Sequence, residues 1–208
     1  MENLHIMEHP LILHKISLLR DKNTQHINFK QLVEEVSMLI CYKATEDAFT
    51  RNIKIETPME ETIGKEVVQK YGIIPIMRAG MGMLDGIAKL MPTAKIGHIG
   101  LYREPRTLEP IEYYCKLPKD IADREVLLLD PMVGTGGTAT TAITFLKDRG
   151  VKNIKLLALI TCETGVNLIH KMHPDVIIYT AAHDKILDDR GYVIPGMGDA
   201  GDRLYGTQ

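Results

Sequence analysis

The sequence predicts an α/β fold with a central, mostly parallel sheet flanked by helices. From Gly72 onward, short apolar runs alternate with helical patterns, which is typical of parallel strands covered on both faces. A glycine-rich turn directly follows one of these runs and opens a helical pattern. The chain has 208 residues, 45% of them hydrophobic and 25% charged, as expected of an ordinary globular domain. We therefore expect residues 1–208 to form a single domain.

The first part of the chain is expected to be helical. Apolar residues recur at helical spacing over Leu11–Leu19 and Leu32–Ile40, so residues 1–50 are predicted to form a helical N-terminal part. Polar and apolar residues then alternate over Asn52–Glu56, which predicts a half-buried strand. The segment Thr57–Glu60 has the pattern of a helix capping box, but a hairpin strand is an equal interpretation.

The remaining elements alternate between strand and helix. Strands are predicted over Ile73–Met77, Lys95–Tyr102, Val126–Leu129, Ile154–Ile160 and Asp175–Thr180, and helices over Leu84–Leu90, Ala139–Lys147 and Gly165–Met172. Ligands of open parallel sheets bind beyond the carboxyl ends of the strands, so the segments that follow each strand are the places to look for chemistry.

Composition argues against several functional classes. A formal net charge of −2 gives no strong field for nucleic acid or an anionic membrane, so neither is expected as a partner. Cys41, Cys115 and Cys162 are odd in number and widely spaced, so we expect small hydrophobes in helices or strands and a reducing cytosol rather than a zinc site or disulfides. The sequence shows no signal-peptide pattern and no apolar window near the ~20 residues of a membrane span, which predicts a cytoplasmic location.

The segment Asp130–Thr138 has the composition of a phosphate cradle. Its glycines let backbone N–H groups approach an anion, and the following helix adds about half a positive charge at its N-terminus. Thr135 and Thr138 can donate hydroxyl hydrogen bonds. No lysine follows the glycines, so this is not a Walker A loop. Asp130 can accept hydrogen bonds from vicinal ribose hydroxyls while the loop holds a 5′-phosphate; a turn without a ligand is the weaker alternative.

Two arginines follow other predicted strands. Arg78 can hold a diphosphate through two parallel hydrogen bonds, although an arginine paired with a nearby carboxylate is a common alternative. Arg103 begins a stretch with two prolines and mixed charge, residues 102–116, which is expected to be a flexible arm or a hairpin of the kind that closes over phosphorylated substrates.

The C-terminal segment 183–208 is expected to bind a base. The stretch Gly191–Thr207 is too glycine-rich for a helix or a long strand, while Tyr192 and Tyr205 argue against disorder, so we expect an ordered loop. The backbone donors and acceptors of such a loop can recognise the alternating carbonyl and N–H groups of a flat pyrimidine ring.

The segments around Arg78, Asp130–Thr138 and Gly191–Thr207, in that order along the chain, resemble those of the uracil phosphoribosyltransferase branch of the type I phosphoribosyltransferases. The resemblance runs from about Met7 to the end of the chain. Val133 and Gly134 depart from the family loop by small substitutions, and Val193 stands where the family often has isoleucine. The resemblance implies a type I phosphoribosyltransferase-like fold. It also implies transfer of the phosphoribosyl group of 5-phospho-α-D-ribose 1-diphosphate (PRPP) to uracil, which forms UMP and diphosphate in pyrimidine salvage.

The resemblance also implies roles for individual residues. Arg78 and Asp199 become the catalytic candidates, with Asp199 a candidate for taking the uracil proton. PRPP contacts are expected from Arg78, Arg103, Asp130, Pro131, Met132, Val133, Gly134, Thr135, Gly136, Gly137, Thr138 and Asp199, and uracil contacts from Val193, Gly198, Asp199 and Ala200.

The resemblance extends to cofactor and partners. Mg²⁺ is expected to bind mainly to PRPP oxygens and water rather than to a set of protein ligands. A homo-oligomer, either a dimer or a tetramer, and activation by a nucleotide such as GTP are typical of the family. Two alternatives stay open at this point. One is a uracil-sensing RNA-binding regulator on the same fold, which the near-neutral charge does not favour; the other is a transferase for a different base.

Overall fold

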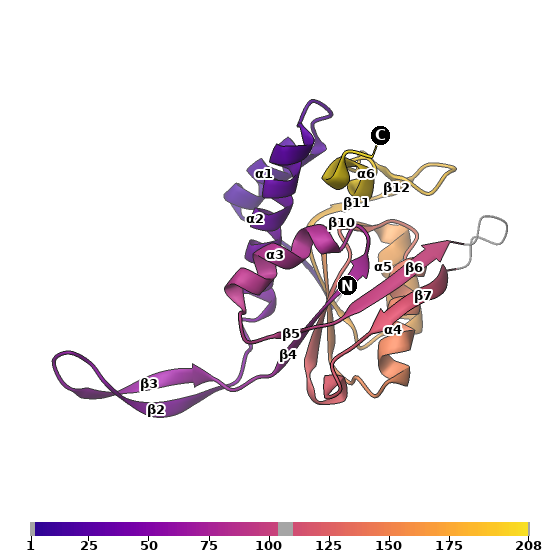
Figure 1. Ribbon diagram of the computed structural model, residues 1–208. Coiled ribbons are helices and arrows are strands. Elements are labelled where there is room, and N and C mark those ends of the chain that lie inside the picture. The colour runs from indigo at the N-terminus through magenta and orange to yellow at the C-terminus, as the bar shows by residue number, and fades with distance from the viewer. Residues whose placement is uncertain (1–2, 104–109, 208) are drawn as a thin grey trace.

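The computed structural model describes residues 3–103 and 110–207 (Figure 1). Within these residues, the strands are β1 (Leu4–Ile6), β2 (Thr50–Glu56), β3 (Glu61–Val67), β4 (Tyr71–Met77), β5 (Lys95–Ile96), β6 (His98–Arg103), β7 (Pro110–Lys116), β8 (Glu125–Leu129), β9 (Met132–Val133), β10 (Ile154–Cys162), β11 (Ile177–Asp184), β12 (Ile186–Leu187) and β13 (Val193–Ile194). The helices are α1 (Pro10–Arg20), α2 (His26–Ala44), α3 (Met81–Leu90), α4 (Gly137–Asp148), α5 (Glu163–Met172) and α6 (Ala200–Tyr205), with a short 3₁₀ helix η1 (Ile121–Asp123).

The central sheet has the order β1-β11-β10-β8-β4-β6-β7, with β5 beside β4 and β9 beside β10. Its strand pairs are parallel except for β6 and β7, which are antiparallel. All of β10, and all of β4 but its last residue, are buried, as expected of strands covered on both faces. The predicted α/β class with a mostly parallel sheet flanked by helices is therefore confirmed.

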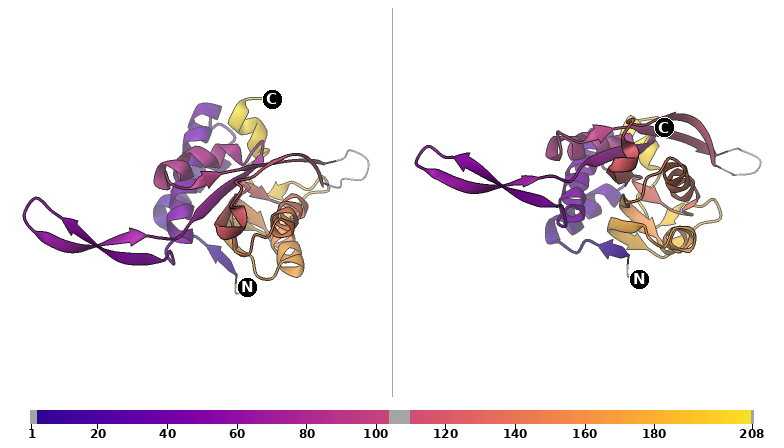
Figure 2. Two further views of the ribbon diagram at one scale, coloured as in Figure 1. Left: turned by 60° about the horizontal axis from the view of Figure 1, so that its bottom comes forward. Right: turned by 90° about the horizontal axis from the view of Figure 1, so that it is seen from below.

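Helices cover both faces of this sheet. Successive side chains of β8 point to opposite faces, so Leu127 and Leu129 enter one hydrophobic core while Val126 and Leu128 enter the other. The first core is completed by α1, α2, α3 and α6, and the second by α4 and α5 (Figures 1 and 2). The N-terminal helices thus lie on the same side of the sheet as the C-terminal segment.

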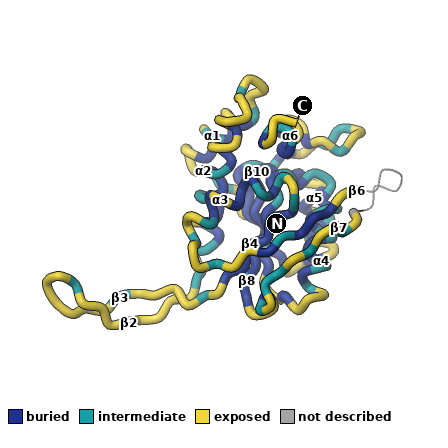
Figure 3. Tube along the Cα trace, in the orientation of Figure 1, coloured by how far each residue is buried: buried dark blue, intermediate teal, exposed yellow. Residues whose placement is uncertain are grey.

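Strands β2 and β3 form a hairpin that projects from the body of the molecule (Figures 1 and 2). The strand expected over Asn52–Glu56 is present, but it is mostly exposed rather than half-buried (Figure 3). Of the two interpretations of Thr57–Glu60, the hairpin is correct. The Thr57 hydroxyl oxygen accepts hydrogen bonds from the N–H groups of Met59 and Glu60, and this local bonding closes the hairpin turn rather than starting a helix.

Three other details differ from expectation. The helical N-terminal part also contains β1, a short strand that pairs with β11 at the edge of the sheet. The strand predicted over Lys95–Tyr102 is divided at Gly97, where an added Cβ would lie 2.8 Å from both the Ile74 side chain and the Lys116 carbonyl oxygen. The exclusion of a helix from Gly191–Thr207 was wrong, because α6 forms there.

The cysteines match the prediction of small hydrophobes. Cys41 and Cys162 are buried in α2 and β10, Cys115 is partly buried in β7, and all three are free thiols. Burial raises the pKa of the Cys41 thiol to about 12. Among the described residues, no helix combines the length and the hydropathy that crossing a bilayer requires.

Candidate functional site

A cavity of about 370 Å³ lies where the segment after β8, the β12–β13 hairpin and the start of α6 meet. It is lined by Ala79, Asp130, Met132, Gly134, Thr135, Arg190, Gly191, Tyr192, Val193, Gly198, Asp199, Ala200 and Gly201. The predicted phosphate cradle and the predicted base-binding segment therefore share one cavity, although they lie some 60 residues apart in the sequence. Its size is within the range of small-molecule sites.

The phosphate cradle joins β8 to α4. Asp130 follows β8 directly, and its carboxylate accepts a hydrogen bond from the Met132 N–H at 3.4 Å. Gly136 adopts a left-handed conformation, with φ of 82°, immediately before α4, and its carbonyl accepts the Thr140 N–H. The first-turn N–H groups of a helix have no acceptor within the helix, so those of α4 are suited to an anion.

The cradle packs backbone against backbone on the start of α5. A Cβ added to Gly136 would lie 2.6 Å from the Gly165 carbonyl oxygen, and one added to Gly165 would lie 2.5 Å from the Gly134 carbonyl oxygen. Neither glycine leaves room for a side chain, so these contacts fix the path of the loop. Sequence reasoning gave Gly165 no role, because its importance depends on a contact across the fold.

The β12–β13 hairpin covers the cradle. A Cβ added to Gly134 would lie 3.0 Å from the Gly191 carbonyl oxygen. Asp188 accepts the Tyr192 N–H at 2.8 Å, and this hydrogen bond holds the pKa of the Asp188 carboxyl below its usual value. The guanidinium of Arg190 lies 5.4 Å from the centre of the Tyr192 ring. Both side chains line the cavity; they lie in the segment expected to bind a base, but neither was a predicted site residue.

The predicted base-binding segment presents both buried and exposed residues to the cavity, since Val193 and Ala200 are buried while Gly198 and Asp199 are exposed. Val193 and Ala200 are 5% and 4% exposed, and Gly198 has a left-handed φ of 76°. Asp199 is the N-cap residue of α6, since its carboxylate accepts the Asp202 N–H at 2.9 Å. This cap explains why a helix forms despite the glycines.

Not every predicted loop residue lines the cavity. Val133 is 1% exposed and belongs to the second hydrophobic core, so it can contact a ligand only through its backbone. Pro131 and Gly136 are also buried. The cavity is lined by Met132, Gly134 and Thr135, but not by Gly137 or Thr138, which lie in the first turn of α4.

Arg78 is not among the residues that line this cavity. Arg78 has a side chain that is 63% exposed, and its Nη2 lies 3.9 Å from Asp202 Oδ1, while the Tyr205 hydroxyl donates to the Arg78 carbonyl at 3.1 Å. It follows a cis Met77–Arg78 peptide bond and lines a smaller cavity of about 200 Å³ with Met77, Met81, Tyr113 and Tyr205. Ala79, the next residue in the chain, lines the cavity of about 370 Å³, so Arg78 lies beside that cavity.

The hairpin interpretation of residues 102–116 is confirmed by the antiparallel pairing of β6 and β7. Arg103 ends β6, but its side chain lies outside the described part of the chain, as do residues 104–109 of the predicted arm. Within the described residues, no group of three or more His, Cys, Asp or Glu side chains is arranged to hold a metal ion.

Comparisons with known proteins identify the family. The family described as "Uracil phosphoribosyltransferase" matches residues 6–207. Proteins named uracil phosphoribosyltransferase from Desulfitobacterium hafniense and Finegoldia magna are 54% and 51% identical to the chain over 209 residues, and each comparison covers 100% of both proteins.

Solved structures with a similar fold include two that cover most of the chain. A protein from Aquifex aeolicus is 32% identical, with a TM-score of 0.92 and 99% of each chain covered. An adenine phosphoribosyl transferase from Trypanosoma brucei, solved with AMP, pyrophosphate and ribose-5-phosphate, is 14% identical with a TM-score of 0.61, covering 92% of this chain and 88% of that one. The second likeness shows the fold alone.

Proposed function

The chain belongs to the uracil phosphoribosyltransferase family, and we propose that it transfers the phosphoribosyl group of PRPP to uracil, forming UMP and diphosphate in pyrimidine salvage. One observation carries this proposal for the site: the cradle around Asp130 and Thr135 and the segment around Val193 and Asp199 line the same cavity. A sugar phosphate on the first and a base on the second would meet at the sugar carbon that joins them.

The cradle supplies the phosphoribosyl contacts in this proposal. Asp130 accepts hydrogen bonds from the ribose hydroxyls, while Thr135 and the N–H groups from Gly134 to Thr138 hold the 5′-phosphate. Pro131 and Val133 are buried, so in this proposal they contribute through the backbone of the loop and not through their side chains. Catalysis is then largely a matter of positioning.

Uracil is held in this proposal by the backbone of Val193 and of Gly198–Ala200. The small side chains there leave room for a flat ring, and backbone groups supply donors and acceptors at fixed positions. Tyr192 also lines the cavity and offers an apolar surface to the base. A transferase for a different base would require other hydrogen-bond donors and acceptors along the backbone of this segment.

In the reaction, the bond between ribose C1 and the diphosphate oxygen breaks and the bond between C1 and uracil N1 forms. Negative charge develops on the departing diphosphate, and Arg78 and Arg103 are the cations assigned to it. The N1 proton must leave uracil, and Asp199 is the carboxylate of the base-binding segment assigned to accept it. Both Arg78 and Asp199 thus keep their predicted catalytic roles as part of the proposal.

Magnesium fits this site mainly as an ion bound to PRPP, with the carboxylates of the cavity nearby. Asp130 and Asp199 line the cavity, and one or two carboxylates with substrate phosphates is a ligand set that Mg²⁺ commonly takes. With both carboxylates assigned to the ribose and the base, the ion would be held mainly by diphosphate oxygens and water. When bound, it would supply positive charge to the leaving group.

A homo-oligomer is part of the proposal as well. The β2–β3 hairpin projects from the body, and a two-stranded hairpin alone is marginally stable in water. Phe49, Met59 and Ile63 on or beside it are 71%, 91% and 58% exposed. A second copy of the chain would cover these side chains, and analytical ultracentrifugation would give the stoichiometry. GTP as an activator is tested by rates measured with and without it.

The decisive experiment offers the purified chain PRPP and Mg²⁺ with uracil, hypoxanthine, adenine or orotate in turn. We expect turnover with uracil, which gives UMP, and no turnover with the other three bases. Turnover of another base in its place would refute the assignment of the base. Uridine-nucleotide-dependent RNA binding without turnover of any base would favour the RNA-binding regulator.

A further inference from the structure

We propose that the ion pair between Arg20 and Asp184 is a positioning device for the base-binding segment, and that it acts by fixing the backbone of Gly196. The inference rests on the proposed function, because it explains how the proposed uracil contacts are kept in place. Asp184 does not line the cavity that contains Asp130 and Asp199, and Arg20 lines only a neighbouring cavity of about 610 Å³ that shares Gly198 and Asp199 with it. Each would therefore act on the proposed uracil contacts through the chain that it holds.

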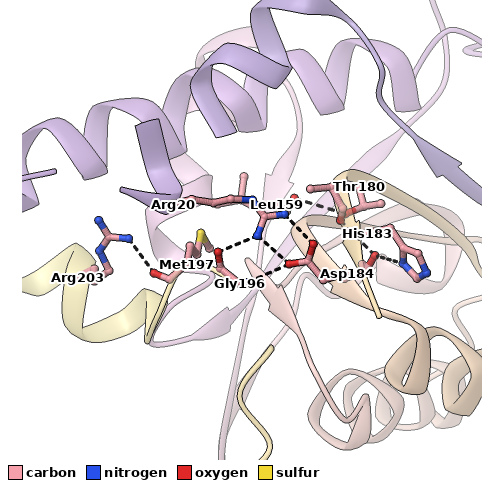
Figure 4. A network of polar contacts seen from close by, with 10 residues as sticks. Arg20, Leu159, Thr180, His183, Asp184, Gly196, Met197 and Arg203 are labelled. Carbon is pink, nitrogen blue, oxygen red and sulfur yellow. Dashed lines mark hydrogen bonds and ion pairs between the residues drawn. The ribbon is translucent and has the colours of Figure 1, made fainter. Parts of the chain in front are cut away.

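The pair holds both backbone polar groups of one residue (Figure 4). Arg20 Nη1 and Nη2 donate to the two carboxylate oxygens of Asp184 at 2.7 and 2.8 Å. The same Nη1 donates to the Gly196 carbonyl at 2.8 Å, and the Gly196 N–H donates to Asp184 Oδ2 at 3.0 Å. A bidentate guanidinium and a carboxylate thus determine the position and the orientation of the peptide groups around Gly196.

Gly196 is in turn close to a residue assigned to uracil. It has a left-handed φ of 55°, and a Cβ added to it would lie 2.1 Å from the Val193 carbonyl oxygen. The turn from Val193 to Gly196 therefore has no free space, and a displacement of Gly196 would move the Val193 carbonyl. Gly198, which lines the cavity, is only two residues further along.

A second arginine anchors the next residue of the turn. Arg203 in α6 donates to the Met197 carbonyl at 2.8 Å (Figure 4). It also donates to the carbonyls of Leu19 and Asp21 at the end of α1. Its guanidinium lies 4.3 Å from the centre of the Phe29 ring. The carboxyl end of α1 therefore supports the turn in two ways. Arg20 binds Gly196 directly, and Arg203 connects the carbonyls at the end of α1 to the Met197 carbonyl.

The pair is built on rigid elements. Asp184 is the last residue of β11 and pairs with Cys162 of β10, and its side chain is only 8% exposed. The Arg20 side chain is 24% exposed at the end of α1. Because a buried ion pair is often no more stabilising than apolar residues of equal volume, stability alone does not account for it. The ion pair is better explained by its effect on the orientation of the turn, because apolar side chains could not hold the backbone polar groups of Gly196.

The test compares Asp184→Asn and Arg20→Met with a matched control, Glu125→Gln. Glu125 forms another buried ion pair, with Lys155 at 2.7 Å, where the side chains are 12% and 4% exposed. That pair lies at the amino end of β8 and does not line the main cavity. Two readouts are needed: the KM values for uracil and for PRPP, and amide hydrogen exchange at Gly196, Met197 and Gly198.

Both variants of the pair are expected to raise the KM for uracil about tenfold or more, the effect of losing one charge-assisted hydrogen bond, with the KM for PRPP within about twofold of the parent. The three amides should exchange faster in these variants and be unchanged in Glu125→Gln. Equal increases in both KM values, or unaltered exchange of the amides, would overturn the proposal. If the parent forms no UMP, the proposed function fails, while the exchange measurement still decides whether the pair fixes the turn.

Discussion

Asp199 has two roles that substitution can separate. Its carboxylate caps α6 by accepting the Asp202 N–H at 2.9 Å, and it also lines the cavity where we place the uracil proton. Asp199→Asn keeps an oxygen that can cap the helix but removes the negative charge. Asp199→Ala removes the cap and the charge together. The difference between the two variants isolates the cap, and the loss common to both isolates the carboxylate.

The two contributions differ in size. Loss of an N-cap costs about 1 kcal/mol, within a range of roughly 0.5–2, whereas asparagine caps about as well as aspartate. In a domain of this size, 1 kcal/mol lowers the melting temperature by about 2–4 °C. A general base typically contributes about 100- to 10,000-fold to the rate. Only the carboxylate term is large enough to remove most of the activity.

Thermal unfolding and single-turnover rates of UMP formation measure the two effects. We expect Asp199→Asn to melt near the parent temperature and Asp199→Ala a few degrees below it, with both slowed about 100-fold or more. A parental rate in Asp199→Asn would refute the reasoning, because it would leave Asp199 as a helix cap only. The same conclusion would follow if the rate of UMP formation fell only in Asp199→Ala, the variant with the lower melting temperature.

Four further changes test the rest of the site and the fold. Asp130→Asn should raise the KM for PRPP about ten- to a hundredfold without changing the melting temperature, and unchanged kinetics would remove Asp130 from the site. Arg78→Lys should lower kcat despite the conserved charge, because an ammonium cannot hold a diphosphate through two parallel hydrogen bonds; full activity would make Arg78 peripheral. Ala200→Leu should raise the KM for uracil and leave PRPP binding intact by calorimetry, since its added atoms enter the cavity. Burial lowers the pKa of His173, so its contribution to stability is complete above about pH 6.5 and is lost as the pH falls below that value. His173→Gln should therefore show a smaller drop in melting temperature between pH 7 and pH 5.5 than the parent, and equal drops would contradict this.

Local patterns in the sequence were sufficient for most of the fold. Continuous apolar runs such as Val126–Leu129 predicted the buried strands, because a strand covered on both faces leaves no polar position. The pattern was less informative where a segment has little tertiary packing. The exposure of β2 and the formation of the edge strand β1 both depend on which elements lie beside them. The alternation of polar and apolar residues along the chain does not contain that information. Helix α6 was missed because a single N-cap, Asp199, outweighs the low propensity of its glycine.

The site shows the same division between local and distant determinants. Asp130 and the glycines of the cradle were predictable, because a strand, a glycine-rich turn and a helix start are consecutive in the sequence. Arg190 carries no such signal: it reaches the cavity only because Asp188 accepts backbone N–H groups of the short hairpin. The approach of Gly165 to Gly136 was equally invisible, since it joins the starts of two different helices.

The departures of this chain from the family loop can now be understood separately. Val133 is buried in the second core, so a change of side chain there alters packing beneath the cradle rather than a ligand contact. Gly134 lies against the Gly191 carbonyl, where an added Cβ at 3.0 Å would need that carbonyl to move by only a few tenths of an ångström. Glycine at this position therefore matters less for its own backbone angles than for the distance between the cradle and the β12–β13 hairpin. Both Gly134 and Gly191 line the cavity, so the residue at position 134 links the phosphate end of the site to the segment that we assign to the base.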